Sequence, residues 1–201
     1  MKIGFAMCGS FCTFQPVLCE LERFCNRFED VVPIMSEISG ETDSRFGTAE
    51  EHIARLTNLC GRRPLKTIQE AEPIGPRALL NLLVIAPCTG NTLGKMACGI
   101  TDSVVTMAAK AQLRNGRPVL IAVSTNDGLG ASGKNIMELM GRRNIYFVPF
   151  GQDDPLEKPD SLKADMTRIT EAAEAAYPHF LIFSECIRKI ILTLCKSNKI
   201  A

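Results

Sequence analysis

The sequence predicts a three-layer α/β/α domain in which helices cover both faces of a doubly wound, mostly parallel β-sheet. Two observations carry this prediction. Five short apolar segments alternate with stretches whose apolar residues recur at helical spacing, the pattern of consecutive strand–helix–strand units. One segment, Leu82 to Ala86, is apolar without interruption, as expected of a strand buried on both faces in a parallel sheet.

The first part of the chain is predicted to form two strands and two helices. Lys2 to Met7 is a short strand that ends at the turn Cys8-Gly9-Ser10. The following helix is indicated by one apolar stripe, made of Val17, Leu18, Leu21, Phe24, Cys25 and Phe28. Val31 to Met35 is the second strand, a polar stretch covers 39–47, and a helix over about 48–60 ends at Gly61.

The second part continues the alternation. The strand at 82–86 is followed by a loop, by helices over 93–98 and 103–113, and by a strand at 119–123. A short helix near 134–141 and a strand at 145–148 come next. We expect residues 152–160 to be a surface loop and 161–201 to be helical with a break at Pro178. A stripe in this last segment predicts a docking face or subunit contact, and its members are Phe183, Ile187, Ile190 and Leu194.

Composition excludes several classes of protein. Lys plus Arg number 23 and Asp plus Glu number 22, so no global field attracts nucleic acid or an anionic membrane surface. No signal peptide is recognised and no apolar run approaches the ~18 residues of a membrane span, which predicts a cytoplasmic protein. The nine Cys contain no CxxC pair and there are two His, so we expect reduced, mostly buried thiols and no metal site.

Ligands of doubly wound sheets bind beyond the carboxyl ends of the strands. This rule selects the loops at 8–10, 36–47, 87–92 and 124–133. Three of them are rich in Gly, Ser, Thr and Asn and poor in charge, which suits a phosphate or a neutral ring held by hydroxyl and backbone donors. The alternative is that these residues only cap helices.

Residues 128–133, GLGASG, match a dinucleotide-binding pattern, and 128–134 match a phosphate-binding loop. The first interpretation is weakened because three residues separate the glycines from the strand, and the second because Asn135 replaces Ser or Thr. We therefore expect a mobile flap beside a site. His52 and His179 stand alone, so no catalytic residue is predicted.

Residues 84–103 resemble the flavoprotein family of cysteine decarboxylases and prenylated-flavin synthases, whose pattern is an apolar strand, Pro, a small polar loop and a helix ending Gly-Ile-x-Asp. Residues 4–10 resemble the family's first strand and Gly-Ser phosphate turn. The segments at 71–76, 124–130 and 144–155, with Arg45-Phe46-Gly47, are similar to one branch, the B-type subunit of an enzyme that makes pyridine-2,6-dicarboxylate. The likeness spans residues 1–165, the expected domain, and leaves 166–201 as a helical extension packed on this domain or on a neighbouring subunit.

The resemblance implies a flavodoxin-like, Rossmann-type fold that holds FMN, often where subunits of a homo-oligomer meet. By position, the phosphate would be received by Gly9, Ser10 and Ser36. The ribityl chain and ring would be lined by Cys88, Thr89, Asn91, Thr92 and Asp102. Two departures from the decarboxylases make cysteine decarboxylation doubtful: their Pro-Ala-Met-Asn loop is replaced by residues 124–127, and their catalytic His has no counterpart.

The resemblance to this branch implies oxidation of a dihydropyridine dicarboxylate during sporulation. It also implies a partner A subunit that resembles nicotinamide-dependent dehydrogenases and through which NADPH would take part. A dianionic substrate requires a cation, preferably Arg. The candidate substrate residues are Arg45, Asn126, Asp127 and Lys134. Three interpretations stay open: a redox flavoprotein subunit, a non-redox subunit that supports the A chain, and a flavin-modifying or decarboxylating enzyme.

Overall fold

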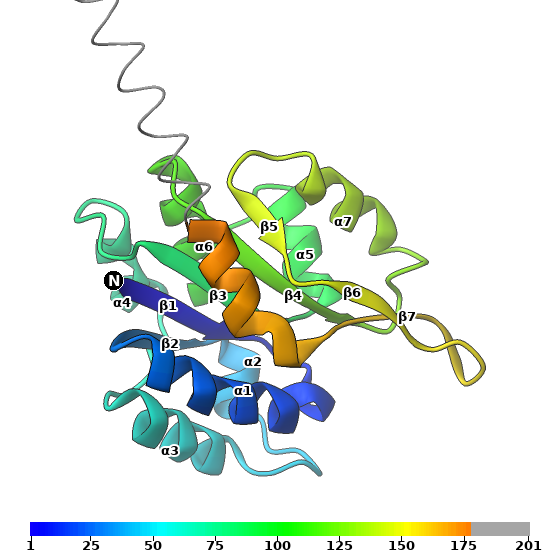
Figure 1. Ribbon diagram of the computed structural model, residues 1–201, viewed down its shortest axis with the longest axis horizontal. Coiled ribbons are helices and arrows are strands. Elements are labelled where there is room, and N and C mark those ends of the chain that lie inside the picture. The colour runs from blue at the N-terminus through cyan, green and yellow to red at the C-terminus, as the bar shows by residue number, and fades with distance from the viewer. Residues whose placement is uncertain (178–201) are drawn as a thin grey trace, which may run out of the picture.

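The computed structural model describes residues 1–177, and its centre is a five-stranded parallel sheet (Figure 1). In spatial order the strands are β2 (Asp30–Met35), β1 (Lys2–Met7), β3 (Leu82–Cys88), β4 (Val119–Thr125) and β5 (Ile145–Phe147). This order, 2-1-3-4-5, is a doubly wound arrangement whose direction reverses between β1 and β3. The predicted fold class is therefore confirmed.

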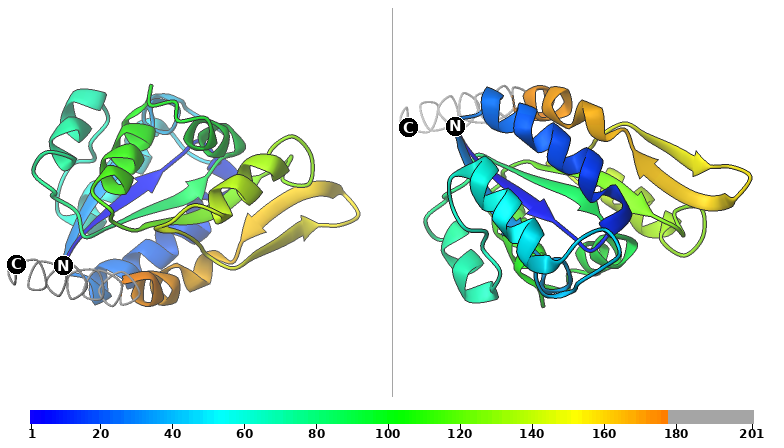
Figure 2. Two further views of the ribbon diagram at one scale, coloured as in Figure 1. Left: turned by 90° about the horizontal axis from the view of Figure 1, so that it is seen from above. Right: turned by 90° about the horizontal axis from the view of Figure 1, so that it is seen from below.

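Helices cover both faces of the sheet (Figures 1 and 2). Side chains that alternate along the strands feed two apolar layers, because successive residues of a strand point to opposite faces. One layer lies under α1 (Phe14–Arg27), α3 (Ala49–Cys60) and the helix at 169–177. The other lies under α4 (Ile68–Ala71), α5 (Gly90–Ala97), α6 (Val104–Arg114) and α7 (Gly133–Met140).

The helix α1 shows how closely local pattern and tertiary structure agree. Its predicted stripe faces the core, and Phe24 at its centre is fully buried between the rings of Phe5 and Phe28, at centroid distances of 5.4 and 4.5 Å. The start of α3 is set by a reciprocal capping box between Thr48 and Glu51. Gly61 adopts the left-handed conformation at the end of that helix, at the predicted position.

The segment after β5 differs from the prediction. Instead of a loop at 152–160 and a helix from 161, the chain forms an antiparallel hairpin of β6 (Phe150–Asp154) and β7 (Lys158–Ala164). The hairpin joins the main sheet where β7 pairs with the end of β4, Ser124 opposite Lys163. It projects from the body of the domain on the side of the strands' carboxyl ends (Figures 1 and 2). Apolar and polar residues do not alternate along these mostly polar strands, so the sequence contains no indication of a strand there.

Two smaller observations complete the fold. The polar stretch after β2 begins with a short helix, α2 (Glu37–Glu41), which Ser36 caps. The helix at 169–177 is anchored to α1 because the buried carboxylate of Glu20 accepts hydrogen bonds from the backbone N–H and the hydroxyl of Thr170. Residues 178–201, with the predicted apolar stripe, lie outside the described part of the chain.

Within residues 1–177, none of the helices combines the length and the hydropathy that crossing a bilayer requires.

Candidate functional site

A polar cavity of about 870 Å³ lies beyond the carboxyl ends of β1, β3 and β4. Its walls come from the loops at 9–13, 89–91 and 124–127, from Arg45 and Phe46, and from the β6–β7 hairpin. The structure thus brings together the three small polar loops selected from the sequence. Arg45 and Phe46 add part of the fourth selected loop, at 36–47. The volume falls within the range of small-molecule and cofactor sites.

Hydroxyl groups connect the loops after β1 and β4 at the floor of the cavity. The Ser10 and Ser124 hydroxyls are 2.8 Å apart, and the Thr13 hydroxyl lies 3.3 Å from that of Ser124 while donating to the Ser10 carbonyl. Neither Ser10 nor Thr13 therefore uses its side chain to cap the helical segment that begins at Phe11. The positive end of this segment remains open to an anion.

The β3 and β4 loops meet at Gly90. A Cβ atom there would lie 2.6 Å from the Thr125 hydroxyl and closer still to that of Ser132, so only glycine allows this approach. Asp127 accepts a hydrogen bond from Thr125, and this bond, with a second from Ser132, lowers the pKa of Asp127. The carboxylate is thus ionised and engaged within its own loop.

The rim of the cavity is positively charged. Lys163 and Lys158 on the hairpin share the carboxylate of Asp153, at 2.5 and 3.1 Å, and these hydrogen bonds lower the pKa of Asp153. Arg45 lines the same cavity, and its guanidinium lies 4.8 Å from the ring centroid of Phe46. The lining of the cavity holds three cations, Arg45, Lys158 and Lys163, and two carboxylates, Asp127 and Asp153. The small positive excess favours an anionic ligand.

The predicted site residues divide into those that line the cavity and those that do not. Lining it are Gly9, Ser10, Arg45, Thr89, Asn91, Asn126 and Asp127. Behind the wall, Ser36 caps α2 beside the end of β1, and Thr92 donates to the sulfur of Cys8 at 3.3 Å. Cys88 is fully buried, and this burial raises the pKa of its thiol.

The other two predicted residues lie outside the cavity wall. Asp102 forms an exposed ion pair with Lys95 at 2.8 Å, and Lys134 lies on α7. In the described chain neither residue lines the cavity, so their assignment remains a prediction.

Sequence reasoning missed the hairpin residues and the two aromatic side chains of the site. The cavity is also lined by Phe11, Phe46, Asp153, Lys158, Ser161, Leu162 and Lys163. A sequence signal existed for both aromatic residues, since Phe11 directly follows the selected loop at 8–10 and Phe46 lies within the selected loop at 36–47. None existed for the hairpin, whose position depends on pairing with β4.

The glycine-rich segment at 126–133 is a turn packed against the hairpin. A Cβ atom on Gly128 would lie 2.5 Å from the Leu162 side chain, and the Leu129 N–H donates to the Asp160 carbonyl at 3.0 Å. Packing against the hairpin therefore explains why residue 128 is glycine, and no bound nucleotide is needed to account for it. The sequence predicts a mobile flap for this segment, and in the structure the same contacts hold it against β7.

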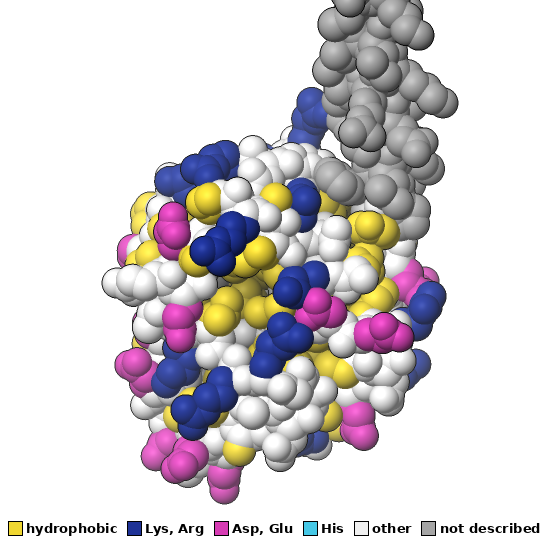
Figure 3. Space-filling view, turned by 90° about the vertical axis from the view of Figure 1, so that its left-hand side faces the viewer, with side chains coloured by type: hydrophobic (Ala, Val, Ile, Leu, Met, Phe, Trp, Pro, Cys, Tyr) yellow, Lys and Arg dark blue, Asp and Glu magenta, His cyan; other side chains and the backbone are white. Residues whose placement is uncertain are grey.

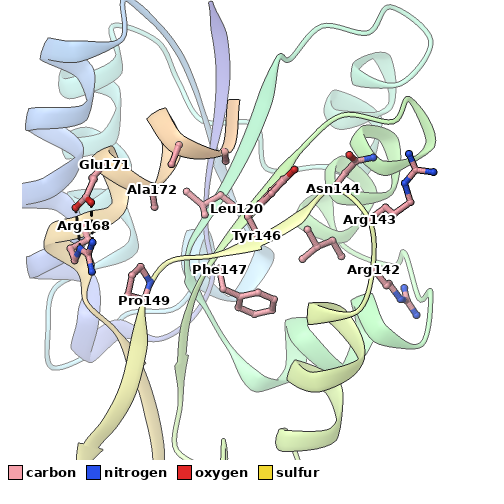
Figure 4. Close-up of a pocket in the computed structure, with 13 residues that line it drawn as sticks. Leu120, Arg142, Arg143, Asn144, Tyr146, Phe147, Pro149, Arg168, Glu171 and Ala172 are labelled. Atoms are coloured by element: carbon pink, nitrogen blue, oxygen red, sulfur yellow. Dashed lines mark hydrogen bonds and ion pairs between the residues drawn. The ribbon is translucent and has the colours of Figure 1, made fainter. Parts of the chain in front are cut away.

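Two other surfaces have features of a binding site. A groove of about 670 Å³ runs between β5 and the helix at 169–177 (Figure 4), but its arginines have protein partners. Arg168 pairs with Glu171 at 2.9 Å and Arg142 donates to the Met96 carbonyl at 3.1 Å. Lys and Arg also gather on the face at the left of Figure 1 (Figure 3), yet this face lies away from the hairpin and the carboxyl ends of the strands.

The loop that carries Arg45 rests on a buried histidine. His52 is 7% exposed, packs edge-on against Phe14 at 4.8 Å between centroids, and has no hydrogen-bond partner for Nε2 among the described residues. Gly47 packs closely against the ring, because a Cβ atom on it would be 3.0 Å from Cε1. Burial lowers the pKa of His52, and Glu51 opposes this effect in part.

This burial predicts an acid sensitivity. The unfolded chain, with a His pKa of about 6.5, binds the proton more readily than the folded chain. The stability contributed by neutral His52 is therefore complete above that value and is lost as pH falls through the lower folded pKa. In melting experiments from pH 8 to 5, we expect the Tm of wild type to fall further than that of His52→Leu. Parallel curves for the two proteins would contradict the prediction.

The doubly wound fold and the cavity at its switch point define a domain of the nucleotide- and cofactor-binding type, and comparison with known proteins gives the family. Residues 28–174 match the model of the Flavoprotein family, so the chain belongs to this family. Within it, the chain is 44% identical over 178 residues to the B subunit of dipicolinate synthase from Bacillus subtilis (strain 168), covering 89% of both chains. It is thus a homologue of that protein.

Solved structures extend the comparison. The crystal structure of the dipicolinate synthase B subunit from Bacillus halodurans C is 44% identical, with a TM-score of 0.79 over 88% of this chain and 91% of that one. The FMN-dependent cysteine decarboxylase SpaF is 22% identical, with a TM-score of 0.61 over 88% of this chain and 97% of that one. The second likeness concerns the fold alone.

Proposed function

We propose that this chain binds FMN in the cavity between β1, β3 and β4 and acts as the B subunit of a dipicolinate synthase. The observation that carries the proposal is the open positive end of the helical segment at Phe11, beside the Ser10, Thr13 and Ser124 hydroxyls at the switch point of the sheet. The 44% identity to named B subunits supports the same assignment.

The donor set fits the parts of FMN. Gly9 and Ser10 would receive the phosphate, with Ser36 behind them, and Thr89 and Asn91 would face the ribityl hydroxyls. Cys88 and Thr92 would form the wall, and Phe11, Phe46 and Leu162 supply apolar surface in a protein without Trp. Asp102 is exposed, so its proposed role requires a neighbouring subunit of a homo-oligomer. FMN, when bound, supplies a hydride acceptor.

The proposed substrate is dihydrodipicolinate, a dianion. It loses one hydride and one proton to become the aromatic dipicolinate, and the hydride ends on the nicotinamide cofactor as NADPH, bound by the A subunit. Arg45 and Lys163 at the rim would hold its carboxylates, while Asn126 and Asp127 shape the wall between them. Lys134 lies on α7 and does not line the cavity of this chain, so its proposed contact with the substrate is tested separately from that of the rim cations. We place this reaction in the cytoplasm of a sporulating cell.

The rim cations give a direct test of substrate binding. Replacing Arg45 and Lys163 together by Ala removes two charge-assisted contacts, and we expect KM for dihydrodipicolinate to rise about 10- to 100-fold with little change in kcat. The assay uses the A subunit with each B variant. Lys110→Ala, which removes an exposed cation on α6, serves as the control and should leave KM unchanged. Equal KM values for all three proteins would rule out this role of the rim.

The assignment as a whole is tested in two steps. When the purified chain is titrated with FMN, we expect flavin fluorescence to be quenched and the protein to show the visible absorption of bound flavin. A chain that takes up no flavin overturns the proposal. Turnover by the A subunit should then require this chain together with FMN. Rescue by a variant unable to bind FMN would favour the non-redox supporting role. Release of CO₂ from a peptide ending in Cys would favour a decarboxylase, the class to which the SpaF neighbour belongs.

A further inference from the structure

Two cysteines lie side by side away from the cavity. Cys25 on α1 and Cys60, the last residue of α3, have their sulfur atoms 3.9 Å apart, and both side chains are half-buried. The two helices run next to each other on one face of the sheet (Figures 1 and 2). The close sulfurs are thus contributed by two separate elements whose relative position is set by the core.

This pair differs from the other thiols of the described chain. Cys8 and Cys88 are almost completely buried, which denies them to reagents in solution. Cys12, Cys19 and Cys98 are exposed. Cys12 and Cys98 lie outside α1 and α3, and Cys19 lies on α1, six residues before Cys25. Cys25 and Cys60 combine partial access with a neighbouring sulfur, the arrangement typical of a reactive thiol and its resolving partner.

We propose that Cys25 and Cys60 form a peroxide-sensitive pair that oxidises to a disulfide joining α1 to α3. The Cys25 thiolate attacks one oxygen of hydrogen peroxide, the O–O bond breaks, and water leaves after proton transfer, which yields a sulfenic acid on Cys25. The Cys60 sulfur then attacks the Cys25 sulfur, the S–O bond breaks and a second water leaves. Two thiols and one peroxide thus give one disulfide and two waters.

The hydrogen bonding between the two thiols supports this order of events. The hydrogen bond between the two sulfurs lowers the pKa of Cys25, whereas that bond and burial raise the pKa of Cys60. Cys25 is therefore the nucleophile and Cys60 the resolving thiol.

The disulfide would couple two sides of the cavity. The segment at 11–13 that leads into α1 lines it, and α3 follows the loop that carries Arg45 and Phe46. A covalent link between α1 and α3 limits how far these walls can separate. It also closes the chain between residues 25 and 60, which restricts the unfolded state and raises Tm.

The test treats the full chain, free of flavin, with hydrogen peroxide and maps its tryptic peptides without reduction. We expect residues 24–27 to be linked to 56–62, the loss of two titratable thiols, a higher Tm, and reversal of all three by dithiothreitol. Cys19→Ser, an exposed change on the same helix, is the matched control and should form the link as wild type does. Cys60→Ser should stop at a Cys25 sulfenic acid that dimedone traps.

Two results would overturn the proposal. One is the absence of the 24–27 to 56–62 link at peroxide levels that already oxidise Cys12, Cys19 and Cys98 in the wild-type chain. The other is a link that joins Cys25 or Cys60 to a different cysteine. Both are read in wild-type protein, so they do not depend on the folding of any variant.

Discussion

Replacing Ser10 by Asp is expected to lower the affinity for FMN by about 100- to 1000-fold while changing the affinity for riboflavin only a few-fold. Ser10 precedes the uncapped helical segment at Phe11, so the new carboxylate would occupy the place proposed for the phosphate. Two like charges about 4 Å apart at an effective dielectric of ~20 repel by roughly 4 kcal/mol, which corresponds to the upper end of this range. Riboflavin has no phosphate and escapes the repulsion.

The measurement is a fluorescence titration of both flavins against wild type, Ser10→Asp and Ser10→Ala. The Ala variant loses the hydrogen bond to Ser124 without adding charge, and we expect a loss of less than about tenfold for FMN. Equal weakening of FMN and riboflavin by the Asp variant would place the phosphate elsewhere. Circular dichroism melting shows whether each variant is folded.

Replacing Phe24 by Ala is expected to lower the free energy of unfolding by about 3–5 kcal/mol. The side chain is fully buried and packs against the rings of Phe5 and Phe28, so truncation leaves a cavity that the sheet and α1 cannot close. The loss is measured by urea unfolding with the slope m compared between proteins.

Phe46→Ala is the matched control for this experiment. Its ring is 45% exposed at the cavity rim, so the same truncation should cost less than about 1 kcal/mol. Similar losses for Phe24→Ala and Phe46→Ala would mean that α1 does not pack on the sheet as described.

The difference between these two phenylalanines illustrates what could be predicted. Phe24 belongs to a stripe whose helical spacing already indicated a core-facing position, and the structure confirms it. The uninterrupted apolar run at Leu82–Ala86 likewise predicted a central strand, because a strand buried on both faces needs no polar alternation. The ends of α3, set by Thr48 and Gly61, followed from capping chemistry within a few residues.

The site was predictable as a set of loops, because the carboxyl ends of parallel strands share one edge of a sheet. The position of single side chains within it was not. Asn91 and Thr92 are neighbours in the same loop, yet Asn91 lines the cavity and Thr92 turns inward to the sulfur of Cys8. Which way each side chain points depends on the helix phase of α5 relative to β1, which no local pattern encodes.

By itself, the sequence determined the doubly wound class, the strands and helices of the parallel core, and the resemblance to a flavoprotein, since each depends on periodicity or short motifs. Only the tertiary structure decided that the polar segment at 150–164 is a hairpin, that its lysines line the same cavity as Arg45, and that Cys25 lies against Cys60. The physical reason is the same in all three cases. These features are contacts between residues distant in the chain, and their free energy arises only when the core brings the segments together.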